Sequence, residues 1–327
     1  MIRLMALLVA IVVALFAASL LVGPAKVSVA DSLSALFAGD KGPLTLFMRE
    51  IRLPRAILAA MIGASLGLAG AAMQGYLRNP LAEPGLIGVS GSAALGAVLA
   101  IHTGLSATFA LGLPLAALTG AFLGVVLVMS LAGPRGTSLT LILAGIAISA
   151  LAAAITSFVL NLSPNPFAAN EIVFWMMGSL TDRSMTHVWL ALPFMALGFA
   201  VLARLGRGLD ALTLGEDAAL AMGIRVDRLR LQLVIGTACV VGAGTAVAGA
   251  IGFVGLVIPH ILRPLVGAHP SRLLWASALG GAAMLLAADI AVRVVLPGRD
   301  LKLGVLTALV GAPLFLHLIL KLRRERI

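Results

Sequence analysis

The chain has 327 residues, of which 61% are hydrophobic and 11% are charged, whereas soluble domains average about 45–50% apolar and about 25% charged residues. This imbalance excludes an ordinary soluble domain and indicates a membrane protein. The formal net charge of +10 comes from Lys and Arg in short gaps between apolar blocks, which fits contact with anionic lipid headgroups and does not predict a nucleic-acid-binding face.

Ten apolar blocks are predicted to cross the membrane, because each approaches the roughly 20 residues that a spanning helix needs. They are 4–23, 56–77, 85–101, 111–132, 139–160, 188–203, 231–249, 251–267, 273–296 and 303–320. The first block is longer than the apolar core of a signal peptide, so we expect a retained helix. The weakest are 188–203, which is marginally long, and 251–267, which contains Pro259, His260 and Arg263.

The positions of Lys and Arg predict which loops face the cytoplasm. With a cytoplasmic N-terminus, the inner loops and the tail hold 14 of the 23 Lys and Arg residues. An even number of spans then places both termini inside. The largest inner loop is 204–230, and the outer loop 161–187 contains a short apolar piece, 172–180, that is expected to be re-entrant or to lie on the surface. The predicted fold class is an all-α polytopic membrane protein with one transmembrane domain over residues 1–327.

The inner loop contains a short polar segment that reads as a helix. Glu216 and Asp217 follow Gly215, and acidic residues favour a helix N-terminus. Good helix formers continue from Ala218 to Met222, and Gly223 can end the helix. From these residues alone, the loop is either an ordinary solvated connection or a docking element for a cytoplasmic partner.

Small residues recur at helical spacing in several of the predicted spans. The sets are Gly63, Gly67 and Gly70; Gly88, Ser92 and Gly96; and Gly120 and Gly124. Small side chains let helices approach closely in lipid, so this pattern predicts helix packing and no chemistry.

Charged residues at the outer ends of the spans have structural and functional interpretations. Asp289 and Arg293 are four residues apart, which places them on one helix face, and a buried carboxylate is costly unless it is paired. We therefore expect a structural ion pair, and not the proton relay for which several acids would be needed. Arg52 and Arg55 flank Leu53-Pro54 just before the second span. They could reach lipid headgroups or offer a positive patch to an acidic soluble partner, and Arg293 could join them.

Known catalytic and metal-binding patterns are missing from the sequence. It has no G-x-x-x-x-G-K-[ST] loop for ATP and no H-E-x-x-H, and its five histidines are scattered. The single cysteine, Cys239, excludes an intrachain disulfide and a cysteine-rich metal site. We therefore expect no catalytic residue, no metal site and no cofactor in this chain.

Seven segments, in the same order along the chain, resemble the FecCD-type permease subunits of ABC importers for iron chelates, haem and cobalamin. They are RLPR (52–55), GASLGLAGAAMQGYLRNPLAEPGLIGVSGSAALGA (63–97), WMMGSL (175–180), LGEDAALAMGI (214–224), GAIGFVGLVIPHILRPLVG (249–267), ADIAVR (288–293) and TALVGAPLF (307–315). The resemblance extends from Ile51 to the C-terminus, and the set of segments is far more specific than any one of them.

The resemblance implies the type II ABC importer permease fold, with ten helices per chain, working as a homodimer in the bacterial inner membrane. It implies two cytoplasmic ATPase subunits that bind ATP and Mg²⁺, and a periplasmic substrate-binding protein. The segment that would dock on the ATPase consists of Gly215, Glu216, Asp217, Ala218, Met222 and Gly223. Arginines matching Arg52, Arg55 and Arg293 would meet acidic residues of the binding protein. An inner gate is expected at Thr137 and Ser138.

The resemblance also implies the transport mechanism, which is alternating access driven by the ATPase. The expected cargo is an iron-siderophore chelate, with haem or cobalamin as alternatives. An ion-coupled secondary transporter would need more intramembrane acids than Asp289, and an intramembrane metalloprotease would need a ligand cluster. The departure from the family lies at 297–304, where Lys302 replaces a common proline and leaves the shape of the outer loop open.

Overall fold

The computed structural model describes residues 1–23, 28–37, 42–133, 136–163, 166–295 and 301–324. Every regular element within these ranges is a helix, as predicted. The long helices are α1 (Ile2–Leu21), α4 (Leu53–Leu77), α7 (Gly112–Ala132), α8 (Ser138–Asn161), α10 (Met185–Ala203), α13 (Val226–Ala248), α15 (Pro270–Val295) and α16 (Leu303–Arg324). The shorter helices are α2 (Val29–Phe37), α3 (Pro43–Leu46), η1 (Phe47–Arg52), η2 (Pro84–Ile87), α5 (Val89–His102), α6 (Leu105–Thr108), α9 (Pro166–Met176), α11 (Gly206–Leu212), α12 (Glu216–Ala221), α14 (Val254–Leu262) and η3 (Pro264–Val266).

Seven helices of the described chain are long and apolar enough to cross a membrane. They correspond to seven of the ten predicted spans, and the other three correspond to α5, α14 and α16. The prediction of a full helix over 251–267 is wrong, because α14 has nine residues and covers only about 14 Å. Gly249 and Phe253 have φ of +73° and +68°. Both residues have positive φ, Gly249 as the C-cap of α13 and Phe253 as the N-cap of α14, and a non-helical segment, 250–252, lies between them.

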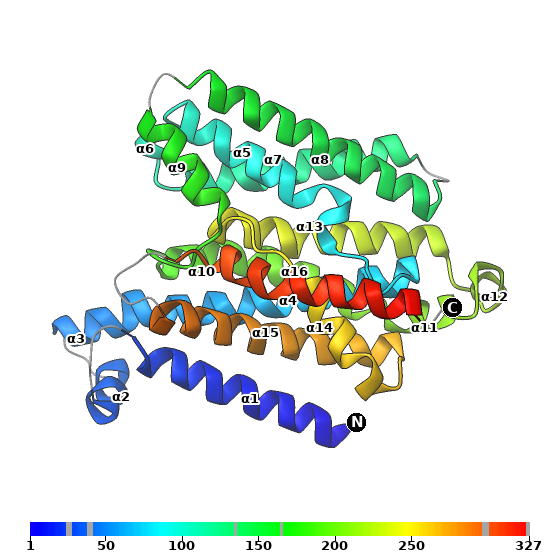
Figure 1. Cartoon of the computed structure of the whole chain (residues 1–327), viewed down its shortest axis with the longest axis horizontal. Coiled ribbons are helices and arrows are strands. Elements are labelled where there is room, and N and C mark those ends of the chain that lie inside the picture. The colour runs from blue at the N-terminus through cyan, green and yellow to red at the C-terminus, as the bar shows by residue number, and fades with distance from the viewer. Residues whose placement is uncertain (24–27, 38–41, 134–135, 164–165, 296–300, 325–327) are drawn as a thin grey trace.

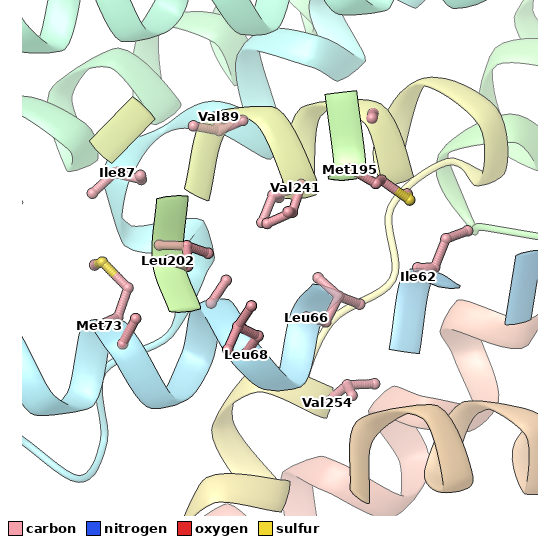
Figure 2. Close-up of a cluster of buried hydrophobic side chains, with 14 of the residues drawn as sticks. Ile62, Leu66, Leu68, Met73, Ile87, Val89, Met195, Leu202, Val241 and Val254 are labelled. Atoms are coloured by element: carbon pink, nitrogen blue, oxygen red, sulfur yellow. The ribbon is translucent and has the colours of Figure 1, made fainter. Parts of the chain in front are cut away.

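Helix α4 lies at the centre of the bundle, where it contacts α15, α14, α13 and α10. Figure 2 shows the apolar side chains that fill this centre. They include Ile62, Leu66, Leu68 and Met73 of α4, Met195 and Leu202 of α10, Val241 of α13, Val254 of α14, Ile87 of η2 and Val89 of α5. The neighbours of α4 therefore come from both halves of the chain, and packing around this one helix fixes their arrangement.

The predicted small-residue packing is confirmed at two helix pairs. A Cβ added to Gly63 or Gly67 of α4 would overlap the backbone carbonyl of Gly281 or Ser277 on α15. Helices α5 and α7 approach in the same way, because a Cβ on Gly120 would overlap the carbonyl oxygen of Ser92. These backbones are close enough that only glycine fits at the contact.

The bundle has two distinct ends (Figure 1). Helices α2, α3, α6 and α9 lie at one end. The start of α1, the end of α16 and the short helices α11 and α12 lie at the opposite end. Helix α1 runs along α15 at the edge of the bundle, and half of its apolar side chains are exposed. The end with α12 is called the α12 end below, and the opposite end the α9 end.

Candidate functional site

The predicted inner-loop helix is present as α12, and glycines define both of its ends. Gly215 is its N-cap residue, with φ of +106°. At the other end, Gly223 has φ of +81°, the amide of Ile224 donates to the carbonyl of Ala219 (2.9 Å), and the amide of Gly223 donates to that of Leu220 (2.9 Å). This is a Schellman ending, which needs a residue in the left-handed region. The sequence prediction of a helix that begins after Gly215 and ends at Gly223 is confirmed.

The outer face of α12 combines acidic and large apolar side chains. Glu216 and Asp217 are exposed. Leu214, Leu220 and Met222 are each more than half exposed as well. Sequence reasoning selected Met222 and missed the two leucines, although apolar residues in the most polar loop of the chain were a visible signal. Exposed leucine and methionine beside carboxylates are typical of a protein-docking surface.

The loop that carries α12 is fastened to the bundle through α11. Leu205, Leu209 and Leu212 are buried. The Asp210 carboxylate accepts a hydrogen bond from the backbone amide of Ser271 (2.9 Å), in the first turn of α15. This caps a free amide at the start of α15. A displacement of the loop would therefore act directly on the start of α15.

A polar cavity of about 320 Å³ lies beside α12 and brings two groups of predicted residues together. Thr137 and Ser138, at the start of α8, line one side, and Glu216 and Leu220 of α12 line another. Thr137 is the N-cap of α8, because its hydroxyl accepts a hydrogen bond from the amide of Thr140 (3.2 Å). The residues predicted as an inner gate thus border the helix predicted to dock on an ATPase.

Two of the three arginines predicted at the α9 end, Arg55 and Arg293, pair with one carboxylate. Asp289 is buried on α15. Its Oδ1 lies 2.8 Å from Nε of Arg55 on α4, and its Oδ2 lies 2.9 Å from Nη2 of Arg293. The pair Asp289–Arg293 has the i,i+4 spacing on which it was predicted. The involvement of Arg55 could not be inferred from spacing, because it joins different helices.

Two of these arginines hold the last turn of α1. Arg52 Nη1 donates to the carbonyls of Leu20 (2.8 Å) and Leu21 (3.1 Å). The Arg293 guanidinium donates to the carbonyls of Ser19 (2.8 Å) and Val22 (2.9 Å), and also to the Ser19 hydroxyl (2.7 Å). Carbonyls at a helix C-terminus lack partners within the helix and carry the negative end of its dipole, so guanidinium groups satisfy both needs. This role was not predicted, because it joins residues that are far apart in the sequence.

Lys302, in the part of the loop 297–304 that the structure describes, packs on α9, whereas residues 297–300 lie outside the described residues. The Lys302 ammonium lies 5.3 Å from the ring centroid of Phe174, a cation–π contact. Below it, the amide of Gly304 donates to the carbonyl of Gly178 (3.2 Å). A cavity of about 510 Å³ opens here, lined by Met176, Met177 and the start of α16. The first half of the predicted apolar piece 172–180 is thus the end of α9, residues 177–180 follow the helix, and the piece borders a cavity at the α9 end.

Buried charge also occurs in the turn between α9 and α10. Burial lowers the pKa of the Arg183 guanidinium from its ordinary value, and the neighbouring Asp182 partly opposes this shift. For metal binding, no group of three or more His, Cys, Asp or Glu side chains gathers among the described residues. The described residues at these sites therefore form exposed surfaces, ion pairs and contacts at helix ends.

Comparison with known proteins gives consistent relatives. The model of the FecCD transport family matches residues 10–321. The chain is 37% identical over 292 residues to the "Uncharacterized ABC transporter permease protein YvrB" of Bacillus subtilis, covering 88% of this chain and 82% of the relative. It is 41% identical over 269 residues to the "Cobalamin import system permease protein BtuC" of Halobacterium salinarum, covering 82% and 72%. It is 36% identical over 280 residues to the "Vitamin B12 import system permease protein BtuC" of Citrobacter koseri, covering 85% and 84%.

Solved structures agree with these relatives. The structure "An inward-facing conformation of a putative metal-chelate type ABC transporter" matches with a TM-score of 0.87 and 32% identity, over 98% of this chain and 100% of that one. PsaBC from Streptococcus pneumoniae, with a TM-score of 0.56 and 17% identity over 88% of this chain and 94% of that one, shares the fold alone. The chain therefore belongs to the FecCD transport family and is a multi-pass membrane permease subunit of an ABC importer.

Proposed function

We propose that two copies of this chain form the pathway of an ATP-driven importer for a bulky metal chelate, and that cobalamin is the first candidate. The assignment of the substrate rests on the cobalamin import permeases among the relatives, which reach 41% identity. The expectation from sequence put an iron-siderophore chelate first, with haem and cobalamin behind. The relatives' names support reversing that order, and a siderophore or haem remains the alternative cargo.

The chain needs partners for this function. Two cytoplasmic ATPase subunits, which bind ATP and Mg²⁺, dock against the exposed face of α12, and a periplasmic binding protein docks at the α9 end near Arg52, Arg55 and Arg293. A second copy covers the apolar faces of α8 and α16. In support, Leu143, Leu151 and Phe158 of α8 and Leu309 and Leu316 of α16 are all more than half exposed in the single chain.

Transport follows by alternating access. ATP binding closes the ATPases, α12 moves with them, and the helices around the two-fold axis change tilt. The start of α8, at Thr137 and Ser138, forms the inner gate. A pathway for a large chelate should have walls without strong binding sites, and the stretches 84–134 and 136–170 hold no Asp, Glu, Lys or Arg.

The decisive experiment is uptake by the reconstituted importer. The chain, its ATPase and its binding protein are placed in proteoliposomes, and radiolabelled cyanocobalamin is the probe. We expect ATP-dependent accumulation that unlabelled cobalamin suppresses and that ferric ferrichrome and haemin do not. Suppression by ferrichrome or haemin alone would transfer the assignment to that chelate. Accumulation without the ATPase would contradict the importer and favour an ion-coupled transporter.

The proposed location is the bacterial inner membrane, with both termini and α12 in the cytoplasm. A Glu216→Cys variant in a Cys239→Ser background tests this orientation. A membrane-impermeant maleimide should label it in inverted vesicles and leave it unlabelled in intact spheroplasts. Labelling from the spheroplast side would overturn the orientation.

A further inference from the structure

Arg230 connects two parts of the chain that are far apart in sequence. It lies in the second turn of α13, and its side chain is 4% exposed. Its Nη1 donates to the carbonyl of Gly136, and its Nη2 donates to the carbonyl of Gly133 (3.3 Å). One guanidinium group therefore joins the start of α13 to the connection between α7 and α8.

The two acceptors, both backbone carbonyls, distinguish this contact from an ordinary hydrogen bond at the surface. Gly133 is the C-cap residue of α7, so its carbonyl is at the negative end of that helix, where it also accepts a hydrogen bond from the amide of Gly136 (3.3 Å). The ion pair of Arg230 with Asp227 is weaker, because the atoms are 3.8 Å apart and the Asp227 side chain is 79% exposed. The two backbone carbonyls are thus the main anchor of the Arg230 guanidinium.

The connection held by Arg230 packs tightly at its far end as well. A Cβ on Gly136 would overlap the carbonyl oxygen of Ala132, the last residue of α7. Gly136 is therefore fixed between α7 and the guanidinium, and the next residue in the chain is Thr137, the N-cap of α8. A shift of Arg230 along α13 would move the start of α8 with it.

The other end of this linkage is α12. Helix α12 ends at Ala221 and α13 begins at Val226, so only four residues separate them. Arg230 also lines the 320 Å³ cavity that has α12 on one side and Ser138 on another. The route from the docking surface to the predicted gate is therefore short and made of covalent chain and one buried side chain.

We propose that Arg230 is a positioning residue that couples movement of α12 to the gate segment Thr137–Ser138. The proposal rests on the proposed function, because it takes α12 as the ATPase contact. It adds a physical link between α12 and the gate segment. Because the guanidinium remains bonded to the Gly133 and Gly136 carbonyls, the start of α8 moves together with α13. A demonstrated two-state response is the evidence such a link requires.

The test measures the gate directly and needs no cargo. A reporter cysteine, Ser138→Cys, is placed in a Cys239→Ser background, and the chain is assembled with its ATPase in nanodiscs. The rate of labelling by a fluorescent maleimide is compared without nucleotide and after trapping with ATP and vanadate. With Arg230 present we expect the two rates to differ by about fivefold or more, the lower range of allosteric coupling.

Arg230→Met should abolish the difference in rate while ATP hydrolysis and co-purification with the ATPase persist. A purely structural role would instead change stability or assembly and leave the nucleotide response in the assembled fraction. The matched control is Arg228→Met, an exposed arginine in the same turns of α13, which should keep the full response. A response retained in Arg230→Met, or lost equally in Arg228→Met, would overturn the proposal.

A second variant keeps the proposal testable if Arg230→Met folds poorly. Arg230→Lys keeps the charge but presents its three donors from one nitrogen in place of the rigid forked guanidinium, so it should hold the two carbonyls less firmly and give a reduced response. A response equal to that with arginine would overturn the proposal. If the reporter with Arg230 intact assembles with the ATPase and shows no nucleotide response, the proposed function fails, and this inference fails with it.

Discussion

Arg55 Nε donates to Oδ1 of Asp289 over 2.8 Å, although the two residues are 234 positions apart in the chain. The second oxygen of the same carboxylate faces Arg293, which in turn holds the last turn of α1. One buried aspartate thus joins α4 and α15 and orients a side chain that fastens α1. Because the carboxylate is fully buried, its contribution can be tested by removing its charge alone.

We predict that Asp289→Asn destabilises the chain strongly. The amide keeps the shape of the side chain but leaves Arg55 and Arg293 without their counter-charge, and breaking a buried ion pair costs about 3–5 kcal/mol. The midpoint of thermal unfolding in detergent should fall well below that of wild type. Glu171→Gln, the same kind of change at an exposed acid, is the control and should leave the midpoint unchanged. Equal midpoints for the two variants would show that the pair is not structural.

The arginines at the α9 end remain the predicted contact for a binding protein. Asp289 pairs with two guanidinium groups, those of Arg55 and Arg293, so this one carboxylate carries less charge than the arginines at the α9 end. The double variant Arg52→Glu/Arg55→Glu should weaken capture of the binding protein, and the loss should be larger at low salt, where screening is weaker. Surface plasmon resonance at two ionic strengths measures this.

These arginines also hold α1, so the docking experiment needs a control for structural damage. Arg52 is only 3% exposed and reaches the carbonyls of α1. Ser19→Ala removes the hydroxyl contact of Arg293 without changing any charge. It should leave capture intact at both salt concentrations. If Ser19→Ala weakens capture as much as the double variant does, the arginines act through α1 and not through the partner.

We predict that Glu216→Lys/Asp217→Lys separates the chain from its ATPase. Both carboxylates are exposed beside Leu220 and Met222, and reversing two charges at the centre of an interface costs well over the 1.4 kcal/mol that corresponds to about tenfold in affinity. Co-purification with the ATPase and ATP-driven uptake should both drop by about tenfold or more.

The control for this prediction reverses two exposed acids at the opposite end, in the variant Asp31→Lys/Glu171→Lys. It makes the same change in net charge and should leave co-purification with the ATPase at the wild-type level. Normal assembly and uptake in the Glu216→Lys/Asp217→Lys variant would place the ATPase contact elsewhere on the α12 end.

The features that were predicted correctly depend on residues that are neighbours in the sequence. Apolar length located the spans, and Gly215 and Gly223 delimited α12, because membrane crossing and helix ends depend on neighbouring residues. The division of 251–267 into a non-helical segment and the short α14 was missed. Its cause is the left-handed φ of Phe253, whose amide is held by the Glu83 carboxylate (2.9 Å) from a distant loop.

In the candidate sites too, the contact between residues close in sequence was predicted, and the contacts between distant segments were not. Spacing predicted the pair Asp289–Arg293, because both residues share a helix face. It could not predict that Arg52 and Arg293 satisfy the carbonyls at the end of α1, nor that Arg230 reaches the connection after α7. Each of those bonds joins segments that are far apart in the sequence and are brought together by helix packing.

A close backbone contact between two helices of that packing gives the last prediction. Gly67→Ala adds a methyl group against the carbonyl oxygen of Ser277 on α15. Alanine improves helix propensity by about 1 kcal/mol, whereas forcing atoms into a packed contact costs about 1–3 kcal/mol. Here the obstacle is backbone, which cannot rotate away, so the upper range applies and the net effect should be a loss of stability.

Gly85→Ala is the matched control, because a Cβ at Gly85 would meet no atom within 4 Å. Both changes reduce the freedom of the unfolded chain equally, so the difference between them isolates the contact of α4 with α15. Thermal unfolding in detergent should show a lowered midpoint for Gly67→Ala and an unchanged or slightly raised midpoint for Gly85→Ala. A Gly67→Ala variant as stable as wild type would mean that α4 and α15 can move apart at no cost, and that backbone contact does not set the centre of this bundle.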